Sequence, residues 1–582
     1  MYHLKKPAGK TGTVSNLDAF IHRGLDTGFS SKWMGVWKPP FKLLDYYAYK
    51  INGIWLDEES LDAVDYGDDI TYYHETESLH VQEKISAPQG LPGVKSELML
   101  QNNEDEKKAV HIVLEAGVDI REKNVDIPEQ DYSVRRDSSK IEVESGKKLS
   151  ITSDRELHNS GEAYVKQHFP GEKQECLVPG ETGVMIELEP GEDKKVEFRF
   201  TSGEASDLVI EKQDNRVEGS QKRVFEASVR SMENLIYDRE GLGIIAGHPW
   251  FQSYWARDTF WTLLGLIDAG YFREAEKILE NFAERGLPGK INLGGKDEET
   301  GRNDTYPLYI IAADKLKRHH KISEKIEDGM EEAFSRLELD NGVVQHNPEG
   351  TWMDTLERPG AVDVQCLWLE AAEIMGEKED KLEEGLEKFE NNHIKDHLGE
   401  EPSHTVNPAV GLMFEQFDEK YLSKINAEFS SLYGARTRSF TDPGYESSGY
   451  HTGSTWGLTS CWAAAANLRN GKTTQGLNFI EKFSGFLDRN QPGALPELVD
   501  SETGESLGCV EQAWSAGMTV HVIDSYLFGI EIDKEKIKID PAPAYTGERH
   551  GKRVGDNYID IKVEDGKAEI LNDPGLDREV LT

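Results

Sequence analysis

Residues 258–286 read DTFWTLLGLIDAGYFREAEKILENFAERG and place two helices of different character one after the other. The first part, 258–270, is apolar nearly all round, and a helix without a polar face must be covered on every side. The second part, 272–286, has one apolar stripe and one charged face, which is typical of a helix bordering solvent. The stretch therefore predicts a helical hairpin with one buried and one half-exposed member.

The same alternation continues from about residue 220 to residue 530, with Gly, Pro and Asn between the segments. The apolar segments are 258–270, 304–316, 361–376, 407–415, 455–469 and 511–529. The amphipathic segments are 221–238, 272–286, 320–337, 379–391, 418–430 and 472–488. Six covered helices alternating with six half-exposed ones describe a toroid of six hairpins, with a parallel inner ring and an antiparallel outer ring. We therefore expect an (α/α)6 barrel over residues 219–532.

The sequence on either side of this helical region has a different period. From about 30 to 215 apolar residues recur at every second position, as at Val110, Ile112 and Leu114, between turn clusters. After 530, the stretch PAPAYTG and the alternating run YIDIKVEDGKAEIL indicate short strands. The expected fold is multi-domain α and β: an N-terminal β-sandwich over 1–218, the barrel over 219–532 and a C-terminal β-appendage over 533–582 packed on the barrel.

The charge of the chain excludes two classes of partner. It carries 107 acidic and 66 basic side chains and a formal charge of -41, spread over its whole length. Phosphate backbones and anionic lipid would be repelled, so we expect no nucleic acid and no membrane as partners. An acid excess of this kind suits a surface adapted to high salt, where screening shortens self-repulsion. We take a moderately halophilic host as a hypothesis.

Motifs for cofactors, metals and export are missing from the sequence. It contains no GxGxxG after a strand, no phosphate-binding loop and no HExxH, so we expect no cofactor and no metal. Reduced thiols are expected because no CxxC or Cys/His spacing joins the four cysteines, Cys176, Cys366, Cys461 and Cys509. The first residues lack an apolar signal region, and no apolar run reaches the length of a membrane span, so we expect a cytoplasmic location.

If the inner helices are parallel, the six loops that precede them open at one mouth of the barrel. These loops are rich in Trp, His, Arg and carboxylates: 248–258, 291–304, 346–360, 400–408, 434–456 and 494–514. The loops at the other end, such as DAGY and RNGK, are short and plain. Because loops on a rigid scaffold commonly carry function, we expect the site at this mouth.

Two of these loops each place a carboxylate beside bulky apolar residues. The first reads TWMDTLE at 351–357, and the second reads ALPELVD at 494–500. Separated carboxyl groups of this kind suit an acid and a base for cleavage of a glycosidic bond. Aromatic faces in the same mouth suit the apolar faces of a pyranose ring, at Trp250, Trp255, Trp352 and Trp456. The sequence is therefore interpreted as that of a glycoside hydrolase, whereas Trp261, Trp368 and Trp462 are read as core residues.

Several blocks resemble the amylo-α-1,6-glucosidases, the glucosidase part of glycogen debranching enzymes, and more distantly the glucoamylases. PWFQSYWARDTF at 249–260 is similar to the signature PWF-x-x-W-x-RD of that family. The other similar blocks follow in the same order: TWMD (351–354), RT (436–437), YHTGSTW (450–456), LPEL (495–498) and GCVEQAWS (508–515). The resemblance covers about 245–529 strongly, and 35–56 more weakly resembles the N-terminal β-domain of the family.

The resemblance implies an inverting mechanism, in which Asp354 protonates the departing oxygen and Glu497 activates a water on the opposite face of the sugar. Burial beside Trp352 and Met353 is expected to raise the pKa of Asp354, and a more polar loop is expected to leave Glu497 ionised. Glu357 is the rival acid. Glu511 is the rival of Glu497, although it also suits a bracing role at the last inner helix.

The remaining candidates would bind the substrate. The resemblance implies that Arg257 and Asp258 hold the outer hydroxyls of the terminal glucose, while a buried ion pair is the structural alternative. Asp304, Arg436, His451 and Gln512 are weaker candidates for contacts with hydroxyls. The complete set of candidate substrate-binding residues is Trp250, Phe251, Trp255, Arg257, Asp258, Asp304, Trp352, Glu357, Arg436, His451, Trp456, Glu511 and Gln512.

The expected function is release of glucose from α-1,6 branch points of glycogen or limit dextrin, with an α-glucan as the partner. A glucoamylase-like exo-α-1,4-glucosidase, or another α-glucosidase or trehalase of the same fold, remains an alternative. A disaccharide phosphorylase would need no base carboxylate, and Glu497 argues against it. A non-catalytic glucan-binding protein is the alternative from another class. The sequence leaves linkage preference, chain-length preference and oligomeric state open.

Overall fold

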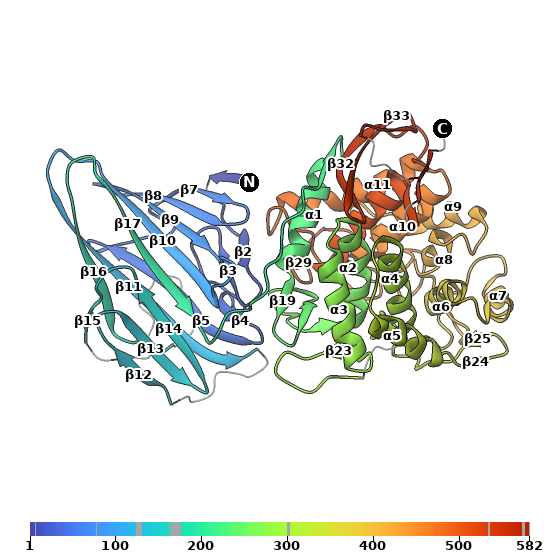
Figure 1. Cartoon of the computed structure of the whole chain (residues 1–582), viewed down its shortest axis with the longest axis horizontal. Helices are drawn as coiled ribbons and strands as arrows, with labels where there is room; N and C mark the ends of the chain where they lie inside the picture. The colour runs from blue at the N-terminus through green and yellow to red at the C-terminus, as the bar shows by residue number, and fades with distance from the viewer. Residues whose placement is uncertain are drawn as a thin grey trace. The chain divides into compact units, whose positions relative to one another are not determined.

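The computed structural model describes residues 1–580 except 6, 77, 124–130, 162, 164–175, 300–302, 534–535 and 573–576. Parts of the expected 291–304 mouth loop and of the C-terminal appendage thus lie outside the described residues. The chain divides into two compact units. One comprises Met1–Val209, Ile236–Arg239 and Asp488–Gly493, and the other Ile210–Leu235, Glu240–Leu487 and Ala494–Thr582. In Figure 1 the strands of the first unit run from blue to teal, and the helices of the second from green to orange.

The first unit is an antiparallel β-sandwich. Within its described residues, one sheet has nine strands in the order β1 (Tyr2–Lys5), β7 (Leu61–Tyr66), β8 (Ile70–Glu75), β9 (Leu79–Ser86), β10 (Gly93–Asn102), β17 (Asp193–Thr201), β14 (Lys147–Ser153), β13 (Lys140–Ser145) and β12 (Ser133–Arg136). The other follows the order β15 (His158–Ser160), β16 (Glu181–Leu188), β11 (Lys108–Glu122), β5 (Phe41–Ile51), β4 (Gly35–Lys38), β3 (Phe20–Gly24) and β2 (Thr11–Ser15), with β6 (Ile54–Trp55) beside β5. The sandwich predicted from the sequence is confirmed.

The sandwich begins earlier than the alternating pattern indicated. The pattern placed the first strands near residue 30, whereas β1 starts at Tyr2. All five residues of β3 are buried, so this strand has no solvent-exposed face and its sequence, FIHRG, does not alternate. Strands with a solvent face do alternate, as in β10, where Val94, Leu98 and Leu100 are buried.

The second unit contains a closed ring of inner helices. These are α2 (Ala256–Asp268), α4 (Thr305–His319), α6 (Val362–Met375), α8 (Ala409–Met413), α10 (Gly457–Arg469) and α12 (Ala513–His521). Each inner helix contacts the next inner helix along the chain, and α12 contacts α2 in turn. The expected (α/α)6 barrel is therefore confirmed. All thirteen residues of α2 are buried, as its apolar sequence requires.

The outer helices cover this ring. They are α1 (Lys222–Asn234), α3 (Phe272–Glu284), α5 (Glu324–Ser335), α7 (Glu379–Leu386), α9 (Leu422–Lys424) and α11 (Thr473–Ser484). In α3 only one stripe is buried, which includes Ala275, Ile278, Leu279 and Phe282. The difference between apolar and amphipathic segments therefore separates the inner ring from the outer ring.

Two predicted helices are shorter or less regular than their segments suggested. The inner segment 407–415 forms only α8, which ends before Glu415 because that residue adopts a left-handed backbone with φ of 61°. The outer segment 418–430 forms a 3-10 turn at Glu419–Tyr421, then α9, then a π-helical turn at Ile425–Phe429. The hydrophobic period indicated the burial of these segments but not their exact hydrogen bonding.

Helices α2 and α12 approach each other closely at two glycines. A Cβ atom added to Gly265 would lie 2.0 Å from the Gly517 carbonyl oxygen, and one added to Gly517 would lie 2.5 Å from the Thr262 Cα. Only glycine allows backbones this near. The ring therefore closes where its first and last inner helices meet without intervening side chains.

Short strands order the loops that precede the inner helices. They are β21 (Gly247–His248) with β29 (Glu511–Gln512), β22 (Tyr254–Trp255) with β23 (Lys290–Ile291), and the ribbon β26 (Ala435–Arg436), β27 (Thr455–Trp456) and β28 (Leu498–Val499). The C-terminal strands β32 (Gly547–Val554), β33 (Asn557–Glu564) and β34 (Lys567–Ile570) form a sheet with β18 (Arg216–Glu218), which precedes the barrel. The strands β30 (Ile530–Asp533), β31 (Lys536–Ile539) and β35 (Asp577–Val580) form another. Across the described residues, no helix is long and apolar enough to cross a membrane.

Candidate active site

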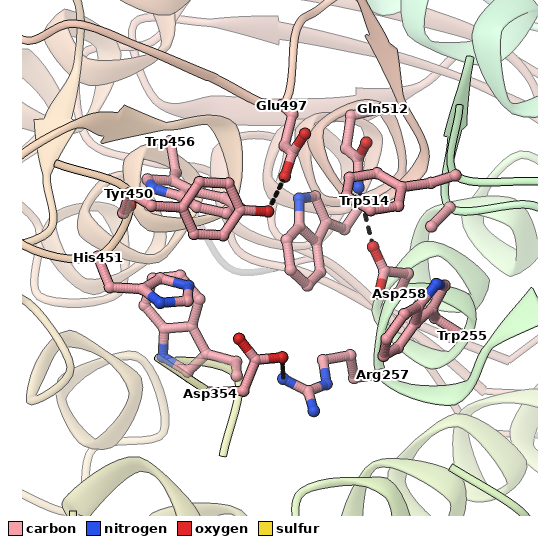
Figure 2. Close-up of a pocket in the computed structure, with 13 residues that line it drawn as sticks. Trp255, Arg257, Asp258, Asp354, Tyr450, His451, Trp456, Glu497, Gln512 and Trp514 are labelled. Atoms are coloured by element: carbon pink, nitrogen blue, oxygen red, sulfur yellow. Dashed lines mark hydrogen bonds and ion pairs between the residues drawn. The ribbon is translucent and has the colours of Figure 1, made fainter. Parts of the chain in front are cut away.

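A cavity of about 210 Å³ opens among the loops that precede the inner helices. Its walls come from the start of α2, the loop before α6, the loop before α10 and the segment leading into α12. The lining residues are Ala246, Phe251, Trp255, Arg257, Asp258, Trp352, Asp354, Tyr450, His451, Trp456, Glu497, Gln512 and Trp514. Figure 2 shows the Asp354 and Glu497 carboxyl groups on different sides of the space that these side chains enclose. The structure therefore brings both carboxylates into one pocket.

Asp354 lies in the loop before α6 and is the more exposed of the two, with 44% of its side chain accessible. Arg257 Nη1 lies 3.7 Å from Asp354 Oδ2, and the guanidinium also donates to the Thr351 carbonyl at 2.7 Å. Partial burial raises the pKa of Asp354, and the charge of Arg257 opposes that rise. The carboxyl group therefore holds a proton more readily than a free aspartate does.

Glu497 is almost completely buried, with 1% of the residue exposed. The Tyr450 hydroxyl donates a hydrogen bond to Oε1, and the Cys509 backbone N–H donates to Oε2 at 2.9 Å. Burial raises the pKa of Glu497 to about 7, although both hydrogen bonds lower it, and the negative charge of Asp354 adds to the rise. Both donors favour the ionised form, which is the form that can accept a proton from water.

The environments of the two carboxylates differ from the sequence-based expectation. Asp354 was expected to be buried and Glu497 to contact water, whereas Glu497 is the buried group. The reason is that Gly508 lets the chain pack tightly over it, since a Cβ atom there would lie 2.4 Å from Glu497 Oε2. The ionised form of Glu497 is therefore favoured by two hydrogen-bond donors and not by contact with water.

Aromatic rings form the wall between the two carboxylates. Trp352 contacts Trp456 and His451 edge to face, with ring centroids 5.5 and 5.3 Å apart, and His451 stacks on Trp456 at 5.4 Å. Burial lowers the pKa of His451 to about 3, so its ring is neutral. This wall offers flat apolar surface without a second positive charge.

Arg257 and Asp258 have different partners. Arg257 is paired with Asp354 and with Asp304, whose Oδ2 lies 3.8 Å from Nε. Asp258 accepts a hydrogen bond of 2.9 Å from Gln512 Nε2, and burial raises its pKa to about 8. Arg257 therefore forms ion pairs with residues of two loops while it lines the pocket, and its contact with a substrate hydroxyl stays a prediction.

The structure places five sequence candidates outside the residues that line the pocket: Trp250, Asp304, Glu357, Arg436 and Glu511. Asp304 lies behind Arg257, and Glu357 is exposed to solvent. Glu511 is 1% exposed and accepts hydrogen bonds from Ser231 Oγ and from the His248 ring, at 2.8 and 2.9 Å. Glu511 thus has the bracing position that was its alternative role.

Sequence reasoning missed three lining residues, Ala246, Tyr450 and Trp514. Tyr450 is the first residue of the block YHTGSTW and Trp514 lies in the block GCVEQAWS, so both stood inside quoted motifs. His451 and Gln512, from the same two blocks, were predicted and do line the pocket. Among the described residues, no group of three or more His, Cys, Asp or Glu side chains is placed to hold a metal ion.

Comparison with known proteins agrees with this fold. Residues 206–401 match the family model described as amylo-alpha-1,6-glucosidase, a segment that contains Asp354 and ends before Glu497. A bacterial glucoamylase complexed with acarbose is 12% identical with a TM-score of 0.56, over 90% of this chain and 94% of that one. A putative kojibiose phosphorylase from human microbiome is 9% identical with a TM-score of 0.57, over 97% and 93%. No curated protein sequence matches the chain significantly.

The chain therefore has the glucoamylase-like fold of (α/α)6 glycosidases. Within it, residues 206–401 match the amylo-alpha-1,6-glucosidase family model, in agreement with the resemblance that the sequence blocks 249–260 and 351–354 indicated for this segment.

Proposed function

We propose that this protein is an inverting glycoside hydrolase that releases glucose from α-1,6 branch points of an α-glucan. The observation that carries the proposal is the presence of Asp354 and Glu497 in one pocket, with an aromatic wall between them. The description of the matching family model supports the α-1,6 linkage. The small volume of the pocket, about 210 Å³, suits the end of a chain and not its middle.

In the proposed reaction, Asp354 donates its proton to the glycosidic oxygen as the bond from that oxygen to the anomeric carbon breaks. A water molecule adds to the anomeric carbon from the opposite face, and Glu497 accepts the proton which that water loses. Inverting enzymes leave room for the water by holding the carboxyl groups roughly 6.5 to 9.5 Å apart. The product is a sugar of inverted anomeric configuration, and proton exchange with solvent resets both groups.

A phosphorylase is the enzymatic alternative, because one similar fold is described as a putative kojibiose phosphorylase. Phosphate binding calls for unpaired cationic donors in the pocket. Arg257 is the one Lys or Arg among the described lining residues, and it is already paired with Asp304 and Asp354. We therefore favour water over phosphate as the nucleophile.

The deciding experiment supplies isomaltose, panose, maltotriose and branched limit dextrin to the purified protein and records glucose and its first anomeric form. Release of β-glucose from isomaltose and limit dextrin is expected, with an unchanged rate when phosphate is added. Preference for maltotriose would replace the proposal with exo-α-1,4 hydrolysis. Glucan binding without any product would make the protein a binding module.

A further inference from the structure

Exposed apolar side chains of the barrel gather on two loops. Between residues 210 and 530 of the described chain, the large hydrophobic side chains that are strongly exposed are Leu432, Phe440, Tyr450 and Leu507. All four lie in 430–456 or 494–512, the segments that supply Tyr450 and Glu497 to the pocket. Apolar surface confined to one functional region of a protein marks a place of contact.

These two loops are joined to each other. The Tyr433 hydroxyl donates to the Thr503 carbonyl at 3.0 Å, and the Tyr445 and Ser501 hydroxyls are 2.8 Å apart. Strand β27 also pairs with β28. The loops therefore behave as one surface.

Phe440 is held in the open on this surface. Its ring is 52% exposed and lies under the Arg436 guanidinium, 5.4 Å from its centroid, and the same guanidinium lies 5.6 Å from the centroid of Tyr445. We call the three side chains Arg436, Phe440 and Tyr445 the ledge. The sequence candidate Arg436, which does not line the pocket, thus belongs to the ledge.

The loop that carries Phe440 is braced. The Ser439 N–H donates to the His404 carbonyl at 2.9 Å, and the His404 N–H donates to Asp442 Oδ2 at 2.9 Å. A Phe on a loose loop could fold back onto apolar surface, whereas these bonds fix its backbone. The hydrogen bonds of the loop therefore keep the Phe440 ring exposed.

The ledge adjoins the edge of the pocket. A Cβ atom added to Gly453 would lie 2.8 Å from Tyr445 Cδ2, so the Tyr445 ring lies against the backbone of that glycine. Gly453 is three residues beyond Tyr450, which lines the pocket and is itself 38% exposed. Residues 450–453 therefore connect the edge of the pocket to the ledge.

We propose that the ledge is a second binding site, which holds outer glucose units of a branched α-glucan while the pocket holds the terminal unit. This inference rests on the proposed function. Aromatic rings match the apolar faces of pyranoses, and the guanidinium and the Tyr445 hydroxyl supply polar partners for neutral hydroxyls. A polymer of several units exceeds the pocket volume of about 210 Å³, so its remainder lies outside. The ledge would thus favour branched polymer over disaccharide.

The test compares wild type with Phe440→Ala, Phe440→Trp and the matched control Tyr558→Ala, which removes a 48% exposed aromatic ring from β33. KM is measured for isomaltose and for branched limit dextrin. Phe440→Ala should raise KM for dextrin about tenfold, since an aromatic contact is lost, and should leave KM for isomaltose unchanged. Phe440→Trp should restore the dextrin KM, and Tyr558→Ala should match wild type.

A parallel binding titration with limit dextrin uses Asp354→Asn and the double variant Asp354→Asn/Phe440→Ala. This titration separates the ledge from the proposed function. If only the proposed function is wrong, the protein releases no glucose but still binds dextrin through the ledge. About tenfold weaker dextrin binding by the double variant would support the ledge in either case. The ledge proposal would be overturned if the single and double variants bound dextrin equally. It would also be overturned if Phe440→Ala raised KM equally for isomaltose and for dextrin. A dimer that dissociates in Phe440→Ala with dextrin binding unchanged would instead assign the ledge to a second copy of the chain.

Discussion

The Tyr450 hydroxyl donates a hydrogen bond to the carboxylate of Glu497, a group that is 1% exposed to solvent. Burial alone would keep this carboxyl group protonated, because the charged form loses its hydration. The Tyr450 and Cys509 donors oppose that effect, and the pKa of Glu497 stands at about 7. A group with this pKa accepts a proton near neutral pH and also releases it again, as a general base must.

Replacing Asp354 or Glu497 is expected to lower turnover strongly. Asp354→Asn and Glu497→Gln should each lower kcat for isomaltose by about 10² to 10⁴, the usual contribution of a general acid or base. Glu357→Gln is the matched control, because this exposed carboxylate lies in the same loop as Asp354 but outside the lining residues. A full rate in Asp354→Asn, together with a loss in Glu357→Gln, would move the acid to Glu357.

Removing the Tyr450 hydroxyl is expected to shift the pH profile. The hydrogen bond lowers the pKa of Glu497, so Tyr450→Phe should raise it above about 7. Because the base must be ionised, the acidic limb of kcat/KM should move to higher pH, and the loss of rate should be greatest below pH 7. The profile is measured for wild type, Tyr450→Phe and Tyr433→Phe, whose hydroxyl donates to the Thr503 carbonyl. An acidic limb that moves to lower pH in Tyr450→Phe, or that moves by the same amount in Tyr433→Phe, would contradict this role of Tyr450.

Gly508 is expected to control the position of the Glu497 carboxylate. In Gly508→Ala the new Cβ atom would lie 2.4 Å from Oε2, so the carboxylate must move. A displacement near 1 Å in a catalytic group lowers the rate by about 10², and we expect a loss of that order in kcat. Gly485→Ala, where a Cβ atom meets nothing within 4 Å, should keep the full rate. Unchanged kcat in Gly508→Ala would show that the loop yields without moving Glu497.

Closure of the inner ring is expected to depend on Gly265. Gly265→Ala places a Cβ atom 2.0 Å from the Gly517 carbonyl oxygen and forces α2 away from α12. Such overpacking destabilises a protein by about 1 to 3 kcal/mol, which thermal or urea unfolding would detect. Gly485→Ala again serves as the reference variant. Equal melting temperatures for the two variants would contradict the tight contact between α2 and α12.

Salt is expected to stabilise the whole chain. With 107 acidic and 66 basic side chains, self-repulsion destabilises the folded state at low ionic strength. Since the Debye length falls to about 3 Å at 1 M salt, the melting temperature should rise steadily as sodium chloride is added. A flat or falling melting temperature would remove the support for a halophilic host.

The sequence was sufficient to predict the barrel because the distribution of apolar residues in a helix indicates how much of its surface is buried. The thirteen residues of α2 have no polar face, and α3 has one, so their places in the two rings follow directly. Asp354 and Glu497 were found because each stands in a loop before an inner helix. The irregular hydrogen bonding in 418–430 and the strands before residue 30 were not predicted, since neither leaves a clear periodic pattern.

The electrostatics of the site could not be predicted in the same way. Whether Glu497 or Glu511 enters the pocket depends on contacts with Tyr450, Ser231 and His248, which lie far from both along the chain. The greater burial of Glu497 likewise depends on how the loop folds around Gly508. Residue types in a loop predict which groups are present, whereas only the fold decides which of them line the same pocket.

The contact between the first and last inner helices also has a consequence for synthesis. Asp258 and Asp354 leave the ribosome well before Glu497, and the ring stays open until the glycine of the last inner helix, Gly517, can meet Gly265. A nascent chain that has not reached this point has an incomplete set of pocket side chains. The chain therefore gains its complete pocket only as the ring is completed.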